Sequence, residues 1–481
     1  MDKPTRSRWR VAMVIFAVLG VGVAGLAYVG WYKLLREVPV KYAFRSDAER
    51  FMYGSLGAEN DQGIPYWIFV VLPRVFPEYL PRAGGYAALG LPWQEGHALP
   101  VGFPKRIIGF PRVGNNCAVC HTATYRTQPD ETPHFVPGGP SHTSNAQALL
   151  RFLTRCAADP RFSANTLLAE IEQNYHLGWI DRVLYRFVII PLTKKRLIER
   201  GESFAWMNRP GWPDWAPGRD DPMNLTKYFM LHLPMDDTVG AADFPAIWNL
   251  HARPDQLLNW DGATTSARSV IIDSALGLGA PPHDAFLKQM QWLEDFLRTL
   301  PPPKYPLPID PTRVASGKPV YDRYCAECHA EDGPRTRKVI DINEIGTDRN
   351  RLDTWTQAAA DGANNTVKSF GIDRSPMIKT NGYIGHPMDA IWLRAPYLHN
   401  GSVPTLRALL DPPAQRPTVF YRGYDVLDPV DVGFISTGAE AERVGVRFDT
   451  QVKGNGNQGH LYGTQLPTNE KDALIEYLKT L

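Results

Sequence analysis

The string Cys-x-x-Cys-His occurs twice in this chain of 481 residues, at Cys117–His121 and at Cys325–His329. This spacing is the attachment signal for c-type haem, in which two thiols form thioethers to one haem and the adjacent histidine ligates its iron. A redox-active dithiol does not need the histidine, and a zinc site made of four thiolates would leave both histidines without a role. The sequence therefore predicts two covalently bound c-type haems, held by Cys117 and Cys120 and by Cys325 and Cys328, with His121 and His329 as the proximal iron ligands.

The bulk composition sets limits on the remaining chain. Four of the five cysteines are assigned to haem, so no disulfide is expected, and Cys156 in an apolar segment is expected to be a buried structural thiol. The hydrophobic content of 44% allows a sizeable core, and a formal net charge of +2 argues against a nucleic-acid partner.

The N-terminal segment is apolar. Residues 11–32 carry no charge and are long enough to span a bilayer, and they follow the basic residues Lys3, Arg6, Arg8 and Arg10. By the positive-inside rule, this end stays in the cytoplasm and the remaining chain is exported. A cleaved signal peptide is the alternative, with Ala24–Ala27 as its cleavage site, although its apolar region would usually be shorter. We expect a single-pass anchor in the bacterial inner membrane with the globular part in the periplasm, where c-type haem is attached.

The expected fold is mainly α, with two cytochrome c-like haem domains that carry long irregular insertions and follow one transmembrane helix. The expected boundaries are an anchor or signal helix at 1–33, a first haem domain at 34–300, a Pro-rich linker at 301–311 and a second haem domain at 312–481.

Apolar periodicity predicts several helices. They cover residues 144–156, 165–175, 179–198 with a break or kink at Pro191, 284–300, and 469–481 with Thr468 as N-cap. Residues 42–110 and 203–221, rich in Pro, Gly and aromatic residues, are expected to be irregular. Residues 317–324 are expected to cross the last helix, as the first helix does in small cytochromes c. Since residues 292–300 align with 473–481, an internal duplication is inferred.

The sixth iron ligand decides whether a haem transfers electrons or binds an exogenous ligand. His460 lies in a Gly/Asn-rich loop just before the last helix and is the expected distal ligand of the second haem, with Met377, Met388 and His399 as alternatives. For the first haem, no candidate has a comparable context among Met223, Met230, His232, Met235 and His251. An open sixth position at the first haem is therefore a hypothesis.

Two tryptophans, Trp248 and Trp260, lie in aromatic segments between the haem motifs. Aromatic residues near haem usually serve packing, but these two are candidates for an electron relay.

Residues 395–406 (APYLHNGSVPTL) resemble the dihaem cytochrome c peroxidase superfamily, and the chain is most similar to its rubber oxygenase branch. Further motifs support the likeness: residues 101–103, 217–219, 221–222 with Asn224, 243–248, 260–262 and 455–460. The resemblance implies that the N-terminal haem, on His121, is the active one with an exchangeable sixth site. It implies that the C-terminal haem, on His329 and His460, stores or relays electrons. Rubber oxygenases are secreted, whereas this chain carries an expected anchor.

The expected function is therefore a membrane-anchored periplasmic dihaem oxidoreductase with peroxidase- or oxygenase-like chemistry at the N-terminal haem. The alternative is a non-catalytic dihaem electron-transfer cytochrome that is associated with a membrane respiratory complex. The expected partners are a redox protein or such a complex, and the inner membrane.

Overall fold

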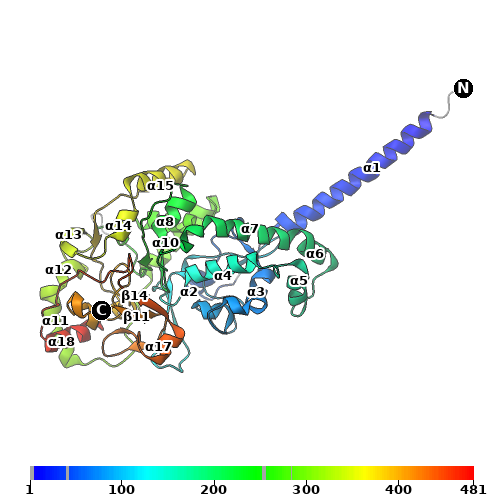
Figure 1. Cartoon of the computed structure of the whole chain (residues 1–481). Coiled ribbons are helices and arrows are strands. Elements are labelled where there is room, and N and C mark those ends of the chain that lie inside the picture. The colour runs from blue at the N-terminus through cyan, green and yellow to red at the C-terminus, as the bar shows by residue number, and fades with distance from the viewer. Residues whose placement is uncertain (1–4, 40–42, 252–255, 283) are drawn as a thin grey trace.

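The computed structural model describes residues 5–39, 43–251, 256–282 and 284–481, so Lys3 of the expected basic flank lies outside the described residues. Helix accounts for 45% of the structure and strand for 11%, so the fold is mixed rather than mainly α. The strands are short and antiparallel, and they form one four-stranded sheet and several two-stranded sheets that the sequence pattern did not predict. Figure 1 shows the apolar helix α1 (Thr5–Gly30) projecting away from the globular body.

The projecting helix meets the length and composition of a membrane span. The apolar segment runs over 27 residues from Trp9 to Leu35, and its most apolar window is not buried by the body of the protein. Its last turn, η1 (Trp31–Leu35), is a π-helical continuation of α1. A signal sequence has the same properties, so α1 is one apolar N-terminal helix suited to either role.

The expected irregular segment 42–110 is more ordered than its composition indicates. It contains α2 (Asp47–Tyr53) and α3 (Tyr66–Val75), and it contributes to a four-stranded sheet in the order β1 (Glu37–Val38), β3 (Lys105–Ile108), β4 (Phe110–Val113) and β2 (Ile64–Pro65). The expectation was wrong because these helices are short and α3 is apolar on nearly every side, which hides the helical period.

A first core is formed by helices that the periodicity predicted. These are α4 (Ala146–Ala158), α5 (Ala164–Glu172), α6 (Trp179–Leu184), η5 (Tyr185–Ile189) and α7 (Ile190–Ser203). Cys156 is fully buried in this core together with Phe152 and Leu167. Pro191 does not break the helix, because it is the second residue of α7, which begins directly after the π-helical turn η5.

A second core surrounds α10 (Asp284–Thr299), whose expected apolar stripe is buried. Phe286, Met290, Leu293 and Leu297 pack with residues of α9 (Ala267–Gly277) and α2. The Phe51 and Phe296 rings lie 5.6 Å apart, and the Arg50 guanidinium lies 3.7 Å from the Trp292 ring centre. An early helix thus packs on the closing helix of the first half.

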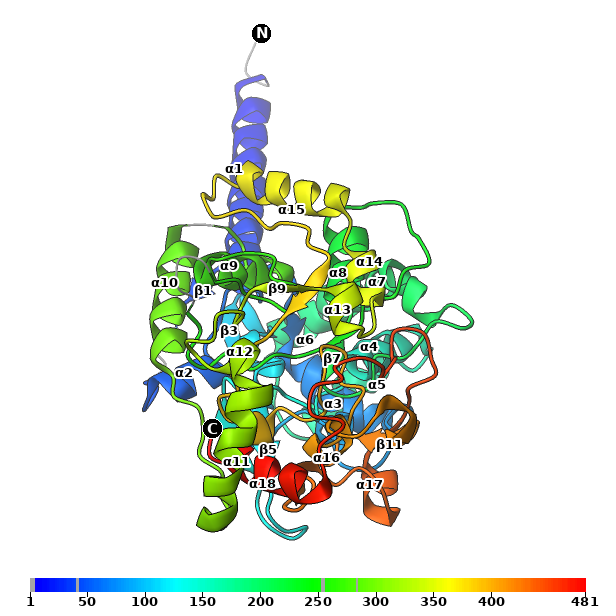
Figure 2. The ribbon, with the colours of Figure 1, turned by 90° about the vertical axis from the view of Figure 1, so that its left-hand side faces the viewer.

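A closer helix pair occurs in the second half, where α11 (Pro311–Tyr324) and α18 (Thr468–Leu478) pack along each other (Figure 2). The expected helix crossing is confirmed. It requires Gly317, because a Cβ there would lie 1.9 Å from the Ala473 carbonyl oxygen. Asp310 caps α11 through its side chain, whereas Thr468 is the first residue of α18 rather than its cap, since Pro467 occupies the cap position.

The two halves share a core. Ala123 and Trp248 from the first half pack in one cluster with Trp392, Leu474 and other residues of the second. The Pro-rich segment joins this body as well, since the Tyr305 and Trp392 rings meet edge to face at 5.6 Å. The two halves of the chain are therefore packed against each other.

Short elements complete the body. The helices are α8 (Pro222–Asn224), α12 (Ala326–His329), α13 (Ile342–Ile345), α14 (Asn350–Thr354), α15 (Gln357–Ser369), α16 (Leu406–Leu409) and α17 (Ala439–Val444). The paired strands are β5 (Thr122–Tyr125) with β6 (His134–Pro137), β7 (Arg219–Asp220) with β8 (Ala242–Asp243), β9 (Val339–Asp341) with β10 (Gly382–Ile384), β11 (Val419–Arg422) with β14 (Val446–Asp449), and β12 (Leu427–Asp428) with β13 (Gly433–Phe434).

Candidate haem-binding sites

The first Cys-x-x-Cys-His motif is held against α2 by the residue that precedes it. Asn116 is buried, and its side-chain oxygen accepts a hydrogen bond from the Ala118 amide at 2.9 Å. Its amide nitrogen donates to the carbonyl oxygens of Phe51 at 3.1 Å and Gly54 at 2.8 Å. The loop that carries Cys117 is therefore fixed by three hydrogen bonds from one side chain.

The imidazole of His121 is oriented by a backbone carbonyl. Its Nδ1 lies 2.9 Å from the Pro245 carbonyl oxygen, and because a carbonyl can only accept, Nδ1 carries the proton. The Nε2 lone pair is then available to a metal, as in histidine ligands that are held by a second hydrogen bond. Burial lowers the pKa of His121 to about 4, which keeps the ring neutral. Phe244 lies beside this ring, at 6.5 Å between ring centres.

The second motif repeats this arrangement. His329 Nδ1 donates to the His386 carbonyl oxygen at 2.7 Å, so its Nε2 is also available, and burial lowers its pKa. The carbonyl reaches His329 because the preceding residue is Gly385, where a Cβ would lie 2.3 Å from the Cys328 carbonyl oxygen. A side chain at this position would push the two segments apart.

The loop before α18 brings His460 to the second motif. The His329 and His460 rings lie 6.2 Å apart between centres, with an interplanar angle of 51°. An imidazole nitrogen binds a metal at about 2 Å and lies about 1.1 Å from its ring centre, so two imidazoles on opposite faces of one iron have centres about 6 Å apart. The observed spacing therefore fits two axial histidines on one iron.

A buried arginine, Arg416, holds the loop that carries His460. Its guanidinium donates to the carbonyl oxygens of Asn457 at 2.5 Å, Gly459 at 2.9 Å and His460 at 3.3 Å. The His460 amide in turn donates to the Ile345 carbonyl at 2.8 Å. Burial lowers the pKa of Arg416 to about 10, so the side chain remains charged at neutral pH.

The alternative ligands of the second haem have other surroundings. The His399 ring stacks on Tyr383 at 3.9 Å, and the backbone amide of Met377 binds the Asn364 side chain. Met388 packs at the edge of the core that the two halves share.

The candidates for the first haem are dispersed. Met223 packs beside Trp355, Met235 is exposed with its sulfur accepting from Arg209, and His251 lies 4.0 Å from Glu331. His232 has a positive φ of 51°, and Met230 ends the π-helical turn η7 (Leu225–Met230).

Burial keeps the four motif thiols protonated when nothing is bound to them. Burial raises the pKa of the Cys117 and Cys325 thiols to about 12 and also raises the pKa values of Cys120 and Cys328. Neutral thiols, and the uncharged thioethers that they would form with haem, are both compatible with this burial. Over residues 5–39, 43–251, 256–282 and 284–481, no three His, Cys, Asp or Glu side chains form a metal-binding group. The residues present thus fit covalent haem.

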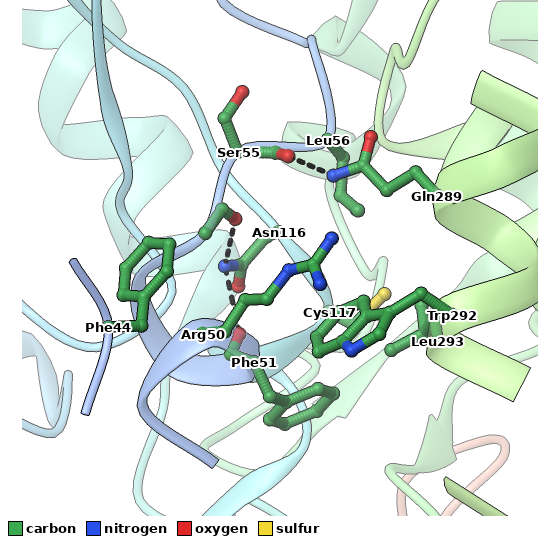
Figure 3. Close-up of a pocket in the computed structure, with 11 residues that line it drawn as sticks. Phe44, Arg50, Phe51, Ser55, Leu56, Asn116, Cys117, Gln289, Trp292 and Leu293 are labelled. Carbon is green, nitrogen blue, oxygen red and sulfur yellow. Dashed lines mark hydrogen bonds between the residues drawn. The ribbon is translucent and has the colours of Figure 1, made fainter. Parts of the chain in front are cut away.

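A cavity of about 210 Å³ reaches the first motif between α2 and α10. Figure 3 shows the Cys117 sulfur beside the Trp292 indole, with the Arg50 guanidinium over that indole. Gln289 closes another side of the cavity by donating to the Ser55 carbonyl. A thioether at Cys117 would therefore lie beside a cavity lined by an aromatic ring and a cation.

The two candidate relay tryptophans differ in their surroundings. Trp248 is buried in the shared core, and the Arg394 guanidinium lies 5.5 Å from its ring centre. Trp260 donates from Nε1 to the Asp243 carbonyl at 2.9 Å and meets the His386 ring edge to face at 5.3 Å. Trp260 thus contacts both segments whose carbonyls hold the proximal histidines.

Several residues that build the sites were not found from the sequence. The contacts of Pro245 and His386 are made by backbone carbonyls, which no residue type reveals. The sequence around Arg416 and Arg422 does not distinguish these buried arginines from exposed ones. Arg422 is fully buried and donates to Asp243 at 2.6 Å. The one sequence signal for the Pro245 carbonyl is its position inside the segment 243–248, whose resemblance to other proteins does not indicate a contact with His121.

Comparison with known proteins supports part of this assignment. Residues 382–421 match a family model described as RoxA-like, cytochrome c-like, and this stretch includes His386 and His399. The match supports a c-type cytochrome and implies a haem cofactor.

Two proteins of Sinorhizobium fredii (strain NBRC 101917 / NGR234) are similar to the chain. The uncharacterized protein y4iM is 31% identical over 287 residues, which cover 50% of this chain and 64% of y4iM. The uncharacterized protein y4iJ is 26% identical over 530 aligned positions, which cover 85% of each protein. The chain thus spans a little less than two thirds of y4iM.

Proposed function

We propose that this protein is a membrane-anchored dihaem c-type cytochrome oxidoreductase. The first haem would be held by Cys117, Cys120 and His121 and would carry peroxidase- or oxygenase-like chemistry. The second would be held by Cys325, Cys328, His329 and His460 and would store or relay electrons. The proposal places the chain in the dihaem cytochrome c peroxidase superfamily, on the rubber oxygenase side.

The observation that carries the proposal is the difference between the two proximal histidines. The His460 ring lies 6.2 Å from the His329 ring between centres, a spacing at which both imidazoles would hold one iron. In the described parts of the chain, the ring that contacts His121 is that of Phe244 rather than of a second histidine. Six-coordinate iron favours electron transfer, and an exchangeable position favours binding of oxygen or peroxide.

Electrons would pass between the haems along contacts that centre on Trp260. This indole is hydrogen bonded to Asp243, two residues before the carbonyl that orients His121. It also packs on His386, whose carbonyl orients His329. The contacts support the relay role for Trp260 more directly than for Trp248.

The protein would position the haems and tune them. When bound, each haem supplies a redox-active iron. The carbonyls of Pro245 and His386 would make His121 and His329 stronger ligands, because they accept hydrogen bonds from the Nδ1 atoms of the two rings. Arg416 keeps the loop of His460 in place through backbone carbonyls. The early and closing helices α2 with α10, and α11 with α18, support two cytochrome c-like units at about 34–300 and 312–481, joined by 301–311.

The proposed setting is the periplasmic face of the inner membrane, with α1 retained as the anchor. Electrons would come from a redox protein or a membrane respiratory complex. A protein anchored in the inner membrane can bind a small oxidant such as peroxide or oxygen, which diffuses to it, but cannot contact an extracellular polymer.

Electron paramagnetic resonance of the oxidised, full-length protein tests the proposal. We expect two haems per chain by pyridine haemochrome, one low-spin ferric signal and one signal that is high-spin or changes when cyanide is added. Two low-spin signals that cyanide does not change would instead support the non-catalytic electron-transfer cytochrome. A single haem per chain would contradict both.

A further inference from the structure

One long helical segment of the body keeps an apolar side exposed. Along α6, η5 and α7, Trp179 is 77% exposed, Val183 48%, Phe187 69% and Leu192 44%. An exposed tryptophan and phenylalanine on one helix form the kind of surface that soluble monomers seldom leave uncovered.

The exposed residues form a stripe because the helix buries its other side. Tyr185 and Ile189 pack into the first core with Leu197. Trp179, Val183 and Phe187 are spaced by four, as neighbours on one helix side are. The next exposed apolar residue, Leu192, follows after five because the π-helical turn η5 adds a residue within this stretch.

This stripe lies next to the foot of α1. Lys33, in the last turn of the apolar N-terminal segment, forms an ion pair with Asp181 of α6 at 2.7 Å. Leu34 packs against the same core as Leu184 of α6. Figure 1 shows α6 beside the point where α1 leaves the body.

The charge of the helix suits a membrane surface. Residues 179–203 contain six basic and three acidic residues. Tryptophan is enriched at both interfaces of a bilayer, and basic side chains near a membrane surface are attracted to anionic headgroups in the leaflet they face, such as phosphatidylglycerol. An amphipathic helix with basic residues beside its apolar side is typical of interfacial membrane binding.

We propose that Trp179, Val183, Phe187 and Leu192 dip into the outer leaflet of the bilayer that α1 crosses. Together with the Lys33–Asp181 ion pair, this second contact would hold the body at one tilt to the membrane instead of leaving it on a single pivot. The inference rests on the proposed anchoring by α1.

Lipid quenching of a site-specific fluorophore tests the inference on the full-length haem protein. The variant Phe187→Cys is labelled with NBD, and the matched control is Val430→Cys, whose side chain is 70% exposed between β12 and β13. The unsubstituted protein gives the labelling background, because Cys156 is buried and the other four thiols are expected to hold haem. Both labelled proteins are placed in vesicles of phosphatidylcholine and phosphatidylglycerol with or without doxyl lipid, and vesicle flotation is measured in parallel.

We expect both proteins to float with the vesicles and doxyl lipid to quench the label at 187 at least about threefold more than the label at 430. If the chain floats but the two labels are quenched equally, α1 is an anchor and the stripe serves another partner, such as a membrane protein, which overturns the inference. If the chain does not float, neither α1 nor the stripe binds lipid, and the proposed anchoring fails as well.

Discussion

At the scale of single residues, the two candidate haem sites differ by one imidazole. His121 and His329 have the same environment, with a neutral ring, a carbonyl partner on Nδ1 and an available Nε2. His460 lies beside His329 because the backbone of its loop is hydrogen bonded to Arg416 and to the Ile345 carbonyl. The proposed division of labour therefore depends on a loop rather than on the motifs.

Replacing the His460 imidazole should change the spin state of the second haem. In His460→Ala we expect the low-spin signal of the second haem to become high-spin, because the sixth ligand is removed, and we expect added imidazole to restore it. Electron paramagnetic resonance and the visible spectrum measure the change.

The same measurement on His399→Ala is the control, since His399 stacks on Tyr383. Its low-spin signal should persist. Loss of that signal in His399→Ala, with an unchanged spectrum in His460→Ala, would move the ligand assignment to His399.

At this scale the sequence identifies the six motif residues and His460 as candidate ligands from their spacing and loop context, and their roles stay predictions. It could not predict Arg416, Asn116 or the carbonyls of Pro245 and His386. Their roles arise from contacts with residues far away in the chain, such as the 124 positions that separate His121 from Pro245.

At the scale of elements, the crossing of α11 and α18 is the part of the fold that was predicted best. The apolar stripe of one helix and the position of the other before a haem motif were sufficient. The β-pairs and the short helices of residues 42–110 were missed, because strands of two to four residues leave no readable period.

The helix crossing makes a prediction for Gly317. A Cβ there would overlap the Ala473 carbonyl, so Gly317→Ala should force the helices apart and destabilise the protein by about 1–3 kcal/mol. The matched control is Gly277→Ala near the end of α9, where a Cβ meets no atom within 4 Å.

Thermal unfolding of the detergent-solubilised protein measures the effect. The control should keep or slightly raise the midpoint, because alanine favours helix over glycine. An equal midpoint for both variants would show that the crossing tolerates a wider spacing than we infer.

At the scale of the whole molecule, a buried ion pair and a buried hydrogen bond, each made by an arginine, join the two halves. Arg422 of the second half donates to Asp243 of the first at 2.6 Å, and the nearby Arg219 donates to Asn455 at 2.8 Å. Burial raises the pKa of Asp243 to about 6, while Arg422 and Arg219 act to lower it. The pair holds the segment that orients His121.

Removing the cation should therefore have a pH-dependent cost. In Arg422→Met the pKa of Asp243 in the folded protein should rise further above 6. At a pH between the ordinary pKa of an aspartate and this raised value, Asp243 is protonated in the folded protein and ionised in the unfolded chain. Relative to the unsubstituted protein, the free energy of unfolding of Arg422→Met should therefore fall as the pH rises above 6. We expect a loss of about 3–5 kcal/mol at pH 8 and a smaller loss at pH 5.

Unfolding midpoints at the two pH values measure this, and Arg422→Met with Asp243→Asn is the matched control. The double variant should regain most of the stability at pH 8. A loss in Arg422→Met that is the same at pH 5 and pH 8 would mean that packing, not the unpaired carboxylate, dominates.

The sequence by itself determined the local features: two Cys-x-x-Cys-His motifs, one apolar N-terminal helix and the amphipathic helices, because each is encoded in residues that are close together in the chain. Only the tertiary structure decided which histidine ring lies beside His329, which carbonyls orient His121 and His329, and which apolar side of α6 and α7 stays exposed beside α1. These features depend on contacts between distant segments, and the buried arginines that hold those segments cannot be told from surface arginines until the chain is folded.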